Sequence, residues 1–167
     1  GYVITCVGDE RCFSFVPSKN GDTLSDRVAQ HVLNHIHPDY KKYTFLDRGS
    51  DERQYCSPGI DLPIASIMRS KYHEYPEYHT SLDNLDFVTQ VGLEGSLNLY
   101  QKVIECIENN HIIQSTVLCE PQLGKRGLYP KFTTKNSMHD IEDMMNLIAY
   151  ADGSKSLLDI ADLIGTP

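Results

Sequence analysis

The chain opens with two short apolar runs that lack any helical period. Residues 2–8 (YVITCVG) and 12–16 (CFSFV) are rich in β-branched and aromatic residues, and a polar turn at residues 9–11 separates them. This composition is typical of strands. The short separation predicts that the two strands pair as a β-hairpin.

Helical spacing occurs at two places in the first 110 residues. Thr23 and Asp26 predict a capped helix start, and Pro38 ends the pattern. The apolar face of this helix comprises Leu24, Val28, Val32 and Ile36. Thr89 predicts the start of a longer helix, whose expected inward residues are Leu93, Leu97, Tyr100, Ile104 and Ile107.

Two further strands are predicted between these helices, each followed by a polar loop. The strands cover residues 42–47 and 62–68, and the loops cover residues 48–58 and 69–86. Strands that alternate with helices predict an α/β domain, in which functional loops follow the carboxyl ends of strands.

The pattern changes at about residue 111. Residues 112–118 are compatible with a strand or a linker, and residues 121–135 predict a loop rich in Gly, Pro, Lys and Arg. Helices are then predicted from Ser137 to about Asp152, and from Ser156, with Asp159 in its capping box, to Gly165. The last helix is typical of the first half of a helix-turn-helix. We therefore expect two domains, residues 1–110 and 111–167.

Composition and charge narrow the function classes. The 167 residues are 40% hydrophobic and 23% charged, which is ordinary for a globular protein. Fifteen Lys and Arg against 23 Asp and Glu give a formal net charge of −8, which disfavours nucleic-acid binding. No apolar run approaches the ~18 residues of a membrane span. The five cysteines form no CxxC pair, which predicts reduced thiols and a cytoplasmic protein.

Two polar loops carry the residues suited to chemistry. One covers residues 49–59, and the other, residues 74–84, contains His79 among several carboxylates. Neutral imidazole is the commonest protein ligand of zinc, and carboxylates serve as further ligands or orient them. A single histidine in an acidic loop is nevertheless more typical of an ordinary surface loop.

The motifs in the two loops, taken in order, resemble a known family. They are Ser50-Asp51, the aromatic Tyr55, Gly59, residues 63–65 (PIA), His79-Thr80 and Asp83. This order resembles the C-terminal half of the M28-type zinc aminopeptidases. The whole chain resembles more closely the bacterial aminopeptidase-like proteins that end in a winged-helix module and are associated with polysaccharide biosynthesis.

The resemblance implies a fold and a cofactor. The fold is a three-layer arrangement with a mixed sheet between helices, followed by a small, mostly helical winged-helix-like module. The cofactor is Zn²⁺, one or two ions in the intact protein, which activates water for attack on a peptide bond. Because the chain opens directly in a strand, we expect further polypeptide upstream of residue 1. The His-x-Asp and Glu-Glu segments of the family are expected there, since residues 1–167 contain no Glu-Glu pair.

The resemblance also assigns individual residues. His79 matches a zinc ligand, and Asp83 matches the carboxylate that supports it. Asp51 matches the Asp of the family's Ser-Asp-His segment. Glu52 replaces the histidine of that segment, so its role is open, and contact with a substrate amine is one role it can fill.

Several assignments stay open. The ligand expected at the end of the first strand is Asp9, with Cys6 as the alternative register, and a carboxylate is the commoner partner of hydrolytic zinc. Tyr55, Tyr75 and Tyr78 are candidates for a substrate pocket, although the aromatic run of Tyr72, Tyr75 and Tyr78 could equally cover the sheet edge. A further His-x-Asp at residues 37–39 lies in the wrong order for a ligand pair and is expected to be a helix-stop loop.

The sequence thus favours a zinc-dependent aminopeptidase-type hydrolase, of which this chain supplies part of the metal site. The expected substrate is a peptide or a small molecule with a free amino terminus. One alternative is a non-catalytic scaffold that keeps the peptidase fold, and another is a single-zinc acyltransferase of the glutaminyl-cyclase kind. The C-terminal tail is expected to mediate homo-oligomerisation or to bind a protein partner.

Overall fold

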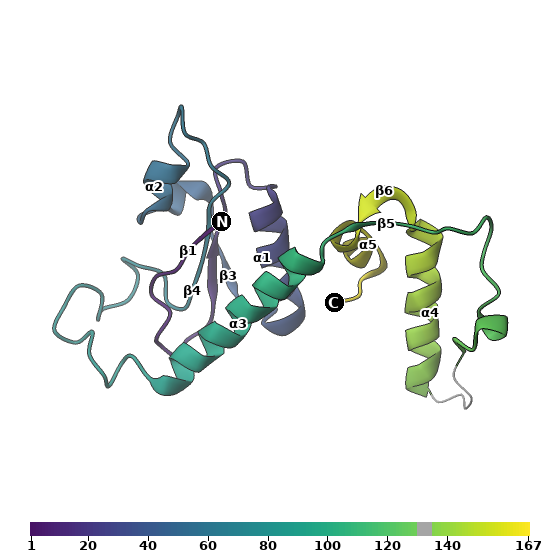
Figure 1. The fold of residues 1–167 in the computed structure, drawn as a ribbon. Coiled ribbons are helices and arrows are strands. Elements are labelled where there is room, and N and C mark those ends of the chain that lie inside the picture. The colour runs from purple at the N-terminus through teal and green to yellow at the C-terminus, as the bar shows by residue number, and fades with distance from the viewer. Residues whose placement is uncertain (130–134) are drawn as a thin grey trace. The chain divides into compact units, whose positions relative to one another are not determined.

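The computed structural model describes residues 1–129 and 135–167, with the side chains of residues 135–138 outside the description. The chain divides into two compact units, Gly1–Ile107 and Glu108–Pro167. The first unit is a mixed α/β structure, and the second combines two helices with a two-stranded sheet (Figure 1).

A four-stranded mixed sheet forms the centre of the first unit. Its strands are β1 (Tyr2–Val3), β2 (Ser14–Val16), β3 (Lys41–Lys42) and β4 (Ala65–Met68). They lie in the order β1-β4-β2-β3. β4 pairs parallel with β1 and antiparallel with β2, and β2 pairs parallel with β3.

The predicted hairpin between the first two strands is therefore wrong. β4 lies between β1 and β2, and all four of its residues are buried. A strand that is buried on both faces gains the most apolar burial in the middle of a sheet. The segment between β1 and β2 is consequently free of pairing and forms a loop that includes Asp9.

Helix α1 (Leu24–Ile36) confirms the predicted capping box. The Thr23 hydroxyl and backbone N–H both donate to the carboxylate of Asp26, at 2.6 and 2.9 Å. Asp26 is fully buried and also accepts from the backbone N–H of Ser18, which ties the preceding loop to the helix. Of the predicted apolar face, Val28 and Val32 are buried, whereas the terminal Leu24 and Ile36 are largely exposed.

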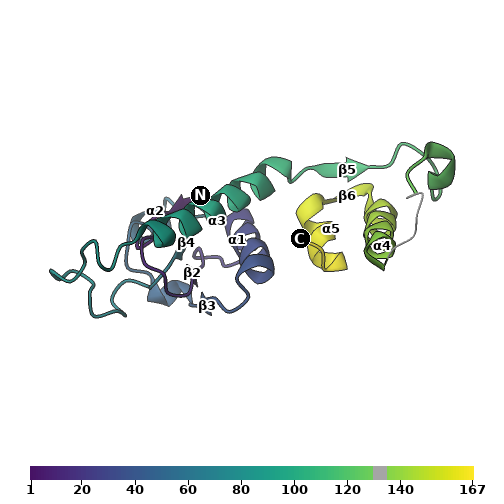
Figure 2. The ribbon, with the colours of Figure 1, turned by 90° about the horizontal axis from the view of Figure 1, so that it is seen from below.

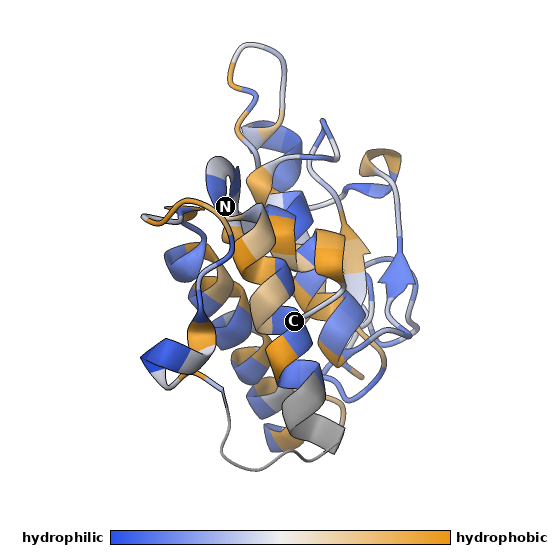
Figure 3. Ribbon diagram, turned by 90° about the vertical axis from the view of Figure 1, so that its right-hand side faces the viewer, coloured by the Kyte–Doolittle hydropathy of each residue, from blue (hydrophilic) through white to orange (hydrophobic). Residues whose placement is uncertain are grey.

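Helix α3 (Gln90–Asn109) occurs where predicted, but a different face is buried. Its buried residues are Gly92, Ser96, Leu99, Tyr100 and Val103. Of the residues that were expected to point inward, Leu93, Leu97 and Ile104 are about half exposed, and only Tyr100 is buried. Apolar spacing alone could not show that small residues face the sheet. Figure 3 shows that the helices carry both hydrophobic and hydrophilic residues.

Close backbone approach explains the buried face of α3. A Cβ atom added at Gly92 would lie 2.0 Å from the carbonyl oxygen of Gly8. One turn further on, the Ser96 hydroxyl donates to the carbonyl of Val7 at 2.7 Å, and the Tyr100 hydroxyl donates to the carbonyl of Ile67 at 2.6 Å. The helix thus lies directly against the loop after β1 and against β4.

A buried arginine reinforces this contact. The Arg69 guanidinium lies 3.8 Å from the ring centroid of Phe13 and donates to the Ser96 hydroxyl and to the carbonyls of Gly92 and Arg11. Burial lowers its pKa, and the nearby carboxylates of Asp9 and Glu10 oppose that shift. Arg69 therefore joins the end of β4 to α3.

Two short helices in the middle of the first unit differ from the prediction, one at the end of a predicted strand and one in a predicted loop. A 3₁₀ turn (Phe45–Asp47) occupies the end of the strand predicted over residues 42–47, and only its start pairs as β3. One helical turn, α2 (Glu52–Tyr55), lies in the segment predicted as loop. The predicted loop over residues 69–86 contains no helix or strand.

The second unit contains β5 (Ile112–Gln114), a 3₁₀ turn (Leu123–Arg126), α4 (Lys135–Tyr150), β6 (Asp152–Ser156) and α5 (Leu157–Ile164). β5 and β6 pair antiparallel, and Figures 1 and 2 show α4 and α5 beside this ribbon. Strand β6 lies where the sequence predicted only a helix stop. Residues 130–134, part of the loop predicted over 121–135, lie outside the described residues.

The capping box predicted for the last helix is confirmed. The backbone N–H of Ser156 donates to the carboxylate of Asp159 at 2.9 Å, and the Ser156 hydroxyl accepts from the backbone N–H of Asp159. Gly165 ends the helix with a φ of 73°, in the left-handed region that favours glycine. Among the described residues, no helix combines the length and the apolarity that a membrane crossing requires.

Gly92→Ala is expected to destabilise the first unit, although alanine is the better helix former. The added methyl group would overlap the carbonyl oxygens of Gly8 and Asp9, and overpacking of this kind costs about 1–3 kcal/mol. Urea denaturation measures the free energy of unfolding. The exposed Asn98→Ala on the same helix is the control and is expected to be neutral or slightly stabilising. Equal stability of the Gly92 variant and wild type would contradict the close approach.

Candidate functional site

The loops that follow β1 and β4 lie at the same edge of the sheet, because these two strands are parallel. In mixed and parallel sheets, ligands bind outside the carboxyl ends of such strands. The loop after β1 contains Cys6 and Asp9, and the loop after β4 contains residues 69–86 with His79. The candidate site is therefore built at this edge.

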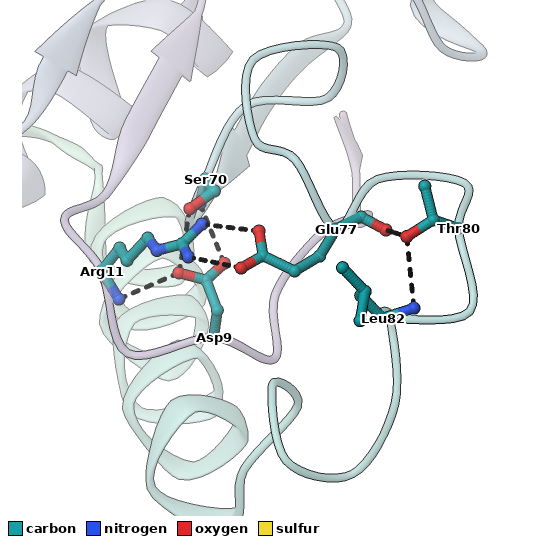
Figure 4. Close-up of polar contacts among 6 residues, drawn as sticks. All are labelled: Asp9, Arg11, Ser70, Glu77, Thr80 and Leu82. Carbon is teal, nitrogen blue, oxygen red and sulfur yellow. Dashed lines mark hydrogen bonds and ion pairs between the residues drawn. The ribbon is translucent and has the colours of Figure 1, made fainter.

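Asp9 joins the two loops (Figure 4). Its carboxylate accepts the backbone N–H of Arg11 at 2.9 Å and both the backbone N–H and the hydroxyl of Ser70 at 3.0 Å. The side chain is only 3% exposed. In this structure Asp9 thus fixes the loop after β1 against the first residues after β4, and its assignment as a metal ligand stays a prediction.

A second contact between the same loops involves Arg11 and Glu77. The two guanidinium nitrogens donate to the two carboxylate oxygens at 2.8 and 3.1 Å, and the guanidinium lies 4.9 Å from the ring centroid of Phe87. The hydrogen bonds from Arg11 lower the pKa of Glu77. The backbone carbonyl of Glu77 accepts a hydrogen bond from the Thr80 hydroxyl, and this hydroxyl accepts one from the backbone N–H of Leu82 (Figure 4). Residues 77–82, which include His79, therefore form a tight turn.

Glu52 connects a third loop, residues 48–56, to the residues after β4. Its Oε1 accepts the backbone N–H groups of Gly49 and Ser50, at 2.7 and 3.0 Å, and the hydroxyl of Tyr72 at 2.7 Å. Burial raises the pKa of Glu52, but these hydrogen bonds outweigh that effect and the net pKa is lowered. The carboxylate is completely buried, so no substrate amine can reach it in this structure.

His79 lies on the exposed side of these contacts. Its φ of 56° is in the left-handed region, which is uncommon for a residue other than glycine. The imidazole stacks on the ring of Tyr78, with ring centroids 3.9 Å apart and an interplanar angle of 14°. Within residues 1–129 and 135–167, no group hydrogen-bonds to this imidazole, so both ring nitrogens are available to a ligand.

The three candidate pocket tyrosines have different environments. Tyr75 is 9% exposed, and its hydroxyl donates to the Cys6 sulfur at 3.4 Å. Burial and this hydrogen bond raise its pKa. Tyr78 packs edge-on against Tyr75, with ring centroids 5.5 Å apart. Tyr55 is 47% exposed at the end of α2.

The remaining candidate carboxylates are exposed. Asp51 is the residue before α2, and its backbone carbonyl accepts from Gln54 and Tyr55. Asp83 lies in a turn, where its backbone N–H donates to the carbonyl of Thr80. In the described part of the chain, neither carboxylate has a recorded contact with His79, so their supporting roles stay predictions.

Comparison with known proteins assigns the family. Residues 1–110 match the model of a domain of unknown function, DUF4910, which covers more than half of the chain. The chain belongs to the DUF4910 family. Residues 111–167 match the model of a winged helix-turn-helix.

Relatives of the DUF4910 chain have peptidase-like names. A Clostridium acetobutylicum protein with the provisional name of polysaccharide biosynthesis protein with aminopeptidase-like domain is 43% identical over 164 residues. A crystal structure of a candidate peptidase from the same organism has 41% identity and a TM-score of 0.86 over 99% of this chain. The chain covers 37% of the first protein and 36% of the second, so it spans little more than a third of their length.

Zinc binding by this DUF4910 domain stays a prediction. His79 supplies an imidazole of the type that zinc prefers, and its ring stacks on Tyr78. Across residues 1–129 and 135–167, no group of three or more His, Cys, Asp or Glu side chains could enclose a metal ion. A zinc ion bound at His79 would therefore need further ligands from outside these residues or a rearrangement of the Asp9 contacts.

Sequence reasoning missed the residues that join the loops of the DUF4910 domain. Ser70, Arg11 and Tyr72 make the cross-loop hydrogen bonds, yet Ser70 and Arg11 do not stand out in the sequence, and Tyr72 does so only as a member of the aromatic run. The available signal was positional, because Ser70 and Tyr72 directly follow a buried strand. The five cysteines form no disulfide with one another in this structure, and their reduced state stays a prediction.

The stability of the DUF4910 domain should depend on the ionisation of Glu52. Because its pKa is lowered by folding, its contribution is fully present above the ordinary value of 4.5 and is lost as the pH falls through the lower folded value. The difference in free energy of unfolding between wild type and Glu52→Gln should therefore shrink below pH 4.5. Urea denaturation at a series of pH values measures it.

The control for the loss of one negative charge is Glu94→Gln on the exposed surface of α3. Its difference from wild type is expected to be small throughout. A difference between wild type and Glu52→Gln that stays constant from pH 7 to pH 3 would contradict a carboxylate stabilised by its hydrogen bonds.

Proposed function

We propose that the whole protein is a zinc-dependent aminopeptidase-type hydrolase that removes N-terminal residues from peptides. In this proposal the present chain supplies part of the metal site, with His79 as a zinc ligand. The remaining ligands and the general base would come from other parts of the protein, whose relatives are almost three times as long as this chain.

The observation that carries the proposal is the position of the His79 imidazole. It stands at the edge where the parallel strands β1 and β4 end, and it is exposed and free of hydrogen bonds among the described residues. Hydrogen bonds to the buried carboxylates of Asp9 and Glu52, together with the exposed ion pair between Arg11 and Glu77, hold the surrounding loops. An exposed imidazole on a firmly held loop is suited to metal binding, because the ligand is oriented before the metal arrives.

Zinc bound there would supply a water of lowered pKa and would polarise the carbonyl of the scissile peptide. This chain would orient one zinc ligand and would form one wall of the substrate pocket. Tyr78, half-buried beside His79, is the candidate wall residue nearest to the proposed zinc ligand. Asp9 is the proposed second ligand from this chain, provided that it exchanges one of its hydrogen bonds for the metal.

The winged helix-turn-helix unit has a separate proposed role as a docking surface for a protein partner or a second copy. A phosphate backbone would require a basic face. Helix α4 instead carries Asp140, Glu142 and Asp143, and the whole chain has a net charge of −8. The charge of this unit therefore supports a protein partner over nucleic acid.

His79→Ala in the intact protein is expected to lower both zinc content and aminopeptidase activity. Loss of a direct ligand should reduce activity by on the order of 10²-fold or more, since loss of even an outer partner costs about 10–100-fold. Metal analysis of the purified protein and hydrolysis of aminoacyl-nitroanilides measure the two effects. The control is His111→Ala, which removes an exposed histidine of the second unit.

The outcomes separate the alternatives. Wild type with no zinc and no hydrolysis would favour the non-catalytic scaffold. Wild type with one zinc that cyclises N-terminal glutamine but releases no amino acid would favour the acyltransferase. Equal zinc content in wild type and His79→Ala would overturn the ligand assignment.

A further inference from the structure

We infer that Glu52 and Tyr72 are positioning residues, which set the orientation of the His79 imidazole through a continuous path of contacting rings. The inference rests on the proposed function, because it takes His79 as the metal-binding group. It gives Glu52, the residue that replaces a histidine in the motif of the similar aminopeptidases, a role away from the substrate.

The path of contacts begins at the carboxylate of Glu52, which its neighbours hold in place. Glu52 is completely buried, and three hydrogen bonds converge on its Oε1. Its other oxygen is buried without a hydrogen-bond partner among the described residues. A buried oxygen without a partner is energetically costly, so the geometry is retained against a penalty. Such a penalty is typical of a group kept for the placement of its neighbours.

Tyr72 transmits this placement to the next loop. Its ring is 2% exposed, and its hydroxyl reaches the Glu52 carboxylate at 2.7 Å. The backbone of Gly49 lies close to the same ring, since a Cβ atom added at Gly49 would approach Tyr72 Cε2 to 2.6 Å. The two loops are therefore interlocked, and a shift of either one displaces the other.

Ring contacts continue from Tyr72 to His79. Tyr72 meets His73 edge-on at 5.6 Å between centroids, and His73 meets Tyr78 edge-on at 4.9 Å. Tyr78 then stacks on His79 at 3.9 Å. His73 and His79 both have left-handed backbone conformations, with φ of 67° and 56°, so the loop between them has little freedom to relax independently.

Two consequences distinguish positioning from simple stabilisation. A merely structural bond would change the melting temperature of the protein and leave the metal affinity of the folded state unchanged. A positioning bond changes the affinity and the geometry of the bound metal, because the imidazole no longer points where the other ligands require it.

The test uses the intact protein with Tyr72→Phe, which removes the hydroxyl and keeps the ring. We expect Zn²⁺ affinity, measured by competition with a chelating dye, to fall about 10–100-fold. We also expect the visible absorption spectrum of the Co²⁺-substituted protein to shift, because that spectrum reports coordination geometry. Affinity is taken from the folded protein, well below its melting temperature.

The matched control is Tyr43→Phe. The Tyr43 hydroxyl also donates to a carboxylate in the loop after β4, that of Glu74, and its ring packs against the buried cluster of Val16, Met68 and Tyr72. The hydrogen bond between Tyr43 and Glu74 is exposed, and Tyr43 is not one of the rings that connect Tyr72 to His79. Tyr43→Phe should keep its Zn²⁺ affinity within about twofold of wild type.

Two substitutions of Glu52 keep the inference testable if Tyr72→Phe folds poorly. Glu52→Gln keeps an oxygen that can accept from Tyr72, whereas Glu52→Ala removes it. Zn²⁺ affinity should therefore fall further in Glu52→Ala than in Glu52→Gln, with a partial rescue by the amide.

Different results would overturn the positioning role and the proposed function. If wild type binds Zn²⁺ through His79 but Tyr72→Phe and Glu52→Ala bind it equally well, the positioning role is overturned and the proposed function stands. If wild type does not bind Zn²⁺, or binds it without His79, the proposed function falls and the positioning role falls with it.

Discussion

The hydrogen bond between the buried hydroxyl of Tyr72 and the buried carboxylate of Glu52 connects two loops that are 20 residues apart in sequence. Both loops also pack apolar side chains into the core, since Cys56, Tyr72 and Tyr75 are buried. Inside a protein, hydrogen bonds between buried groups are strong, and they are costly to leave unsatisfied. The bond to Glu52 therefore adds a polar contact that holds the start of the loop after β4, the loop that contains His79.

Three carboxylates accept the hydrogen bonds that join the loops at this edge of the sheet. Asp9 and Glu52 are buried and accept backbone N–H groups, while Glu77 is bound by both guanidinium nitrogens of Arg11. The imidazole of His79 is left without a hydrogen bond in the described part of the chain. This division is suited to a site in which acidic groups fix the loops and a neutral nitrogen meets the ligand.

The relatives of this chain have peptidase-like names. In the DUF4910 domain the loops after β1 and β4 converge at one edge of the sheet, and ligands of α/β sheets bind at the carboxyl ends of such strands. The partial character of the donor set in this chain is equally informative. No group of three or more His, Cys, Asp or Glu side chains among the described residues could enclose a metal ion, so the proposed zinc site would need ligands from other parts of the protein.

The sequence by itself determined the features that depend on near neighbours in the chain. The capping boxes at Thr23 and Ser156 and the presence of α1, α3 and α5 follow from residues three or four positions apart. The motif around His79 was also recognisable, because a resemblance is carried by order and spacing.

Only the tertiary structure decided the strand order, the buried face of α3 and the role of Glu52. β4 separates β1 from β2 because burial in the centre of a sheet is a property of the whole domain, which a two-strand pattern does not contain. α3 buries Gly92 because the backbone of Gly8 approaches it, across 84 positions of the chain. Glu52 became a buried tie because Tyr72 meets it in space, and sequence spacing carries no information about such a meeting.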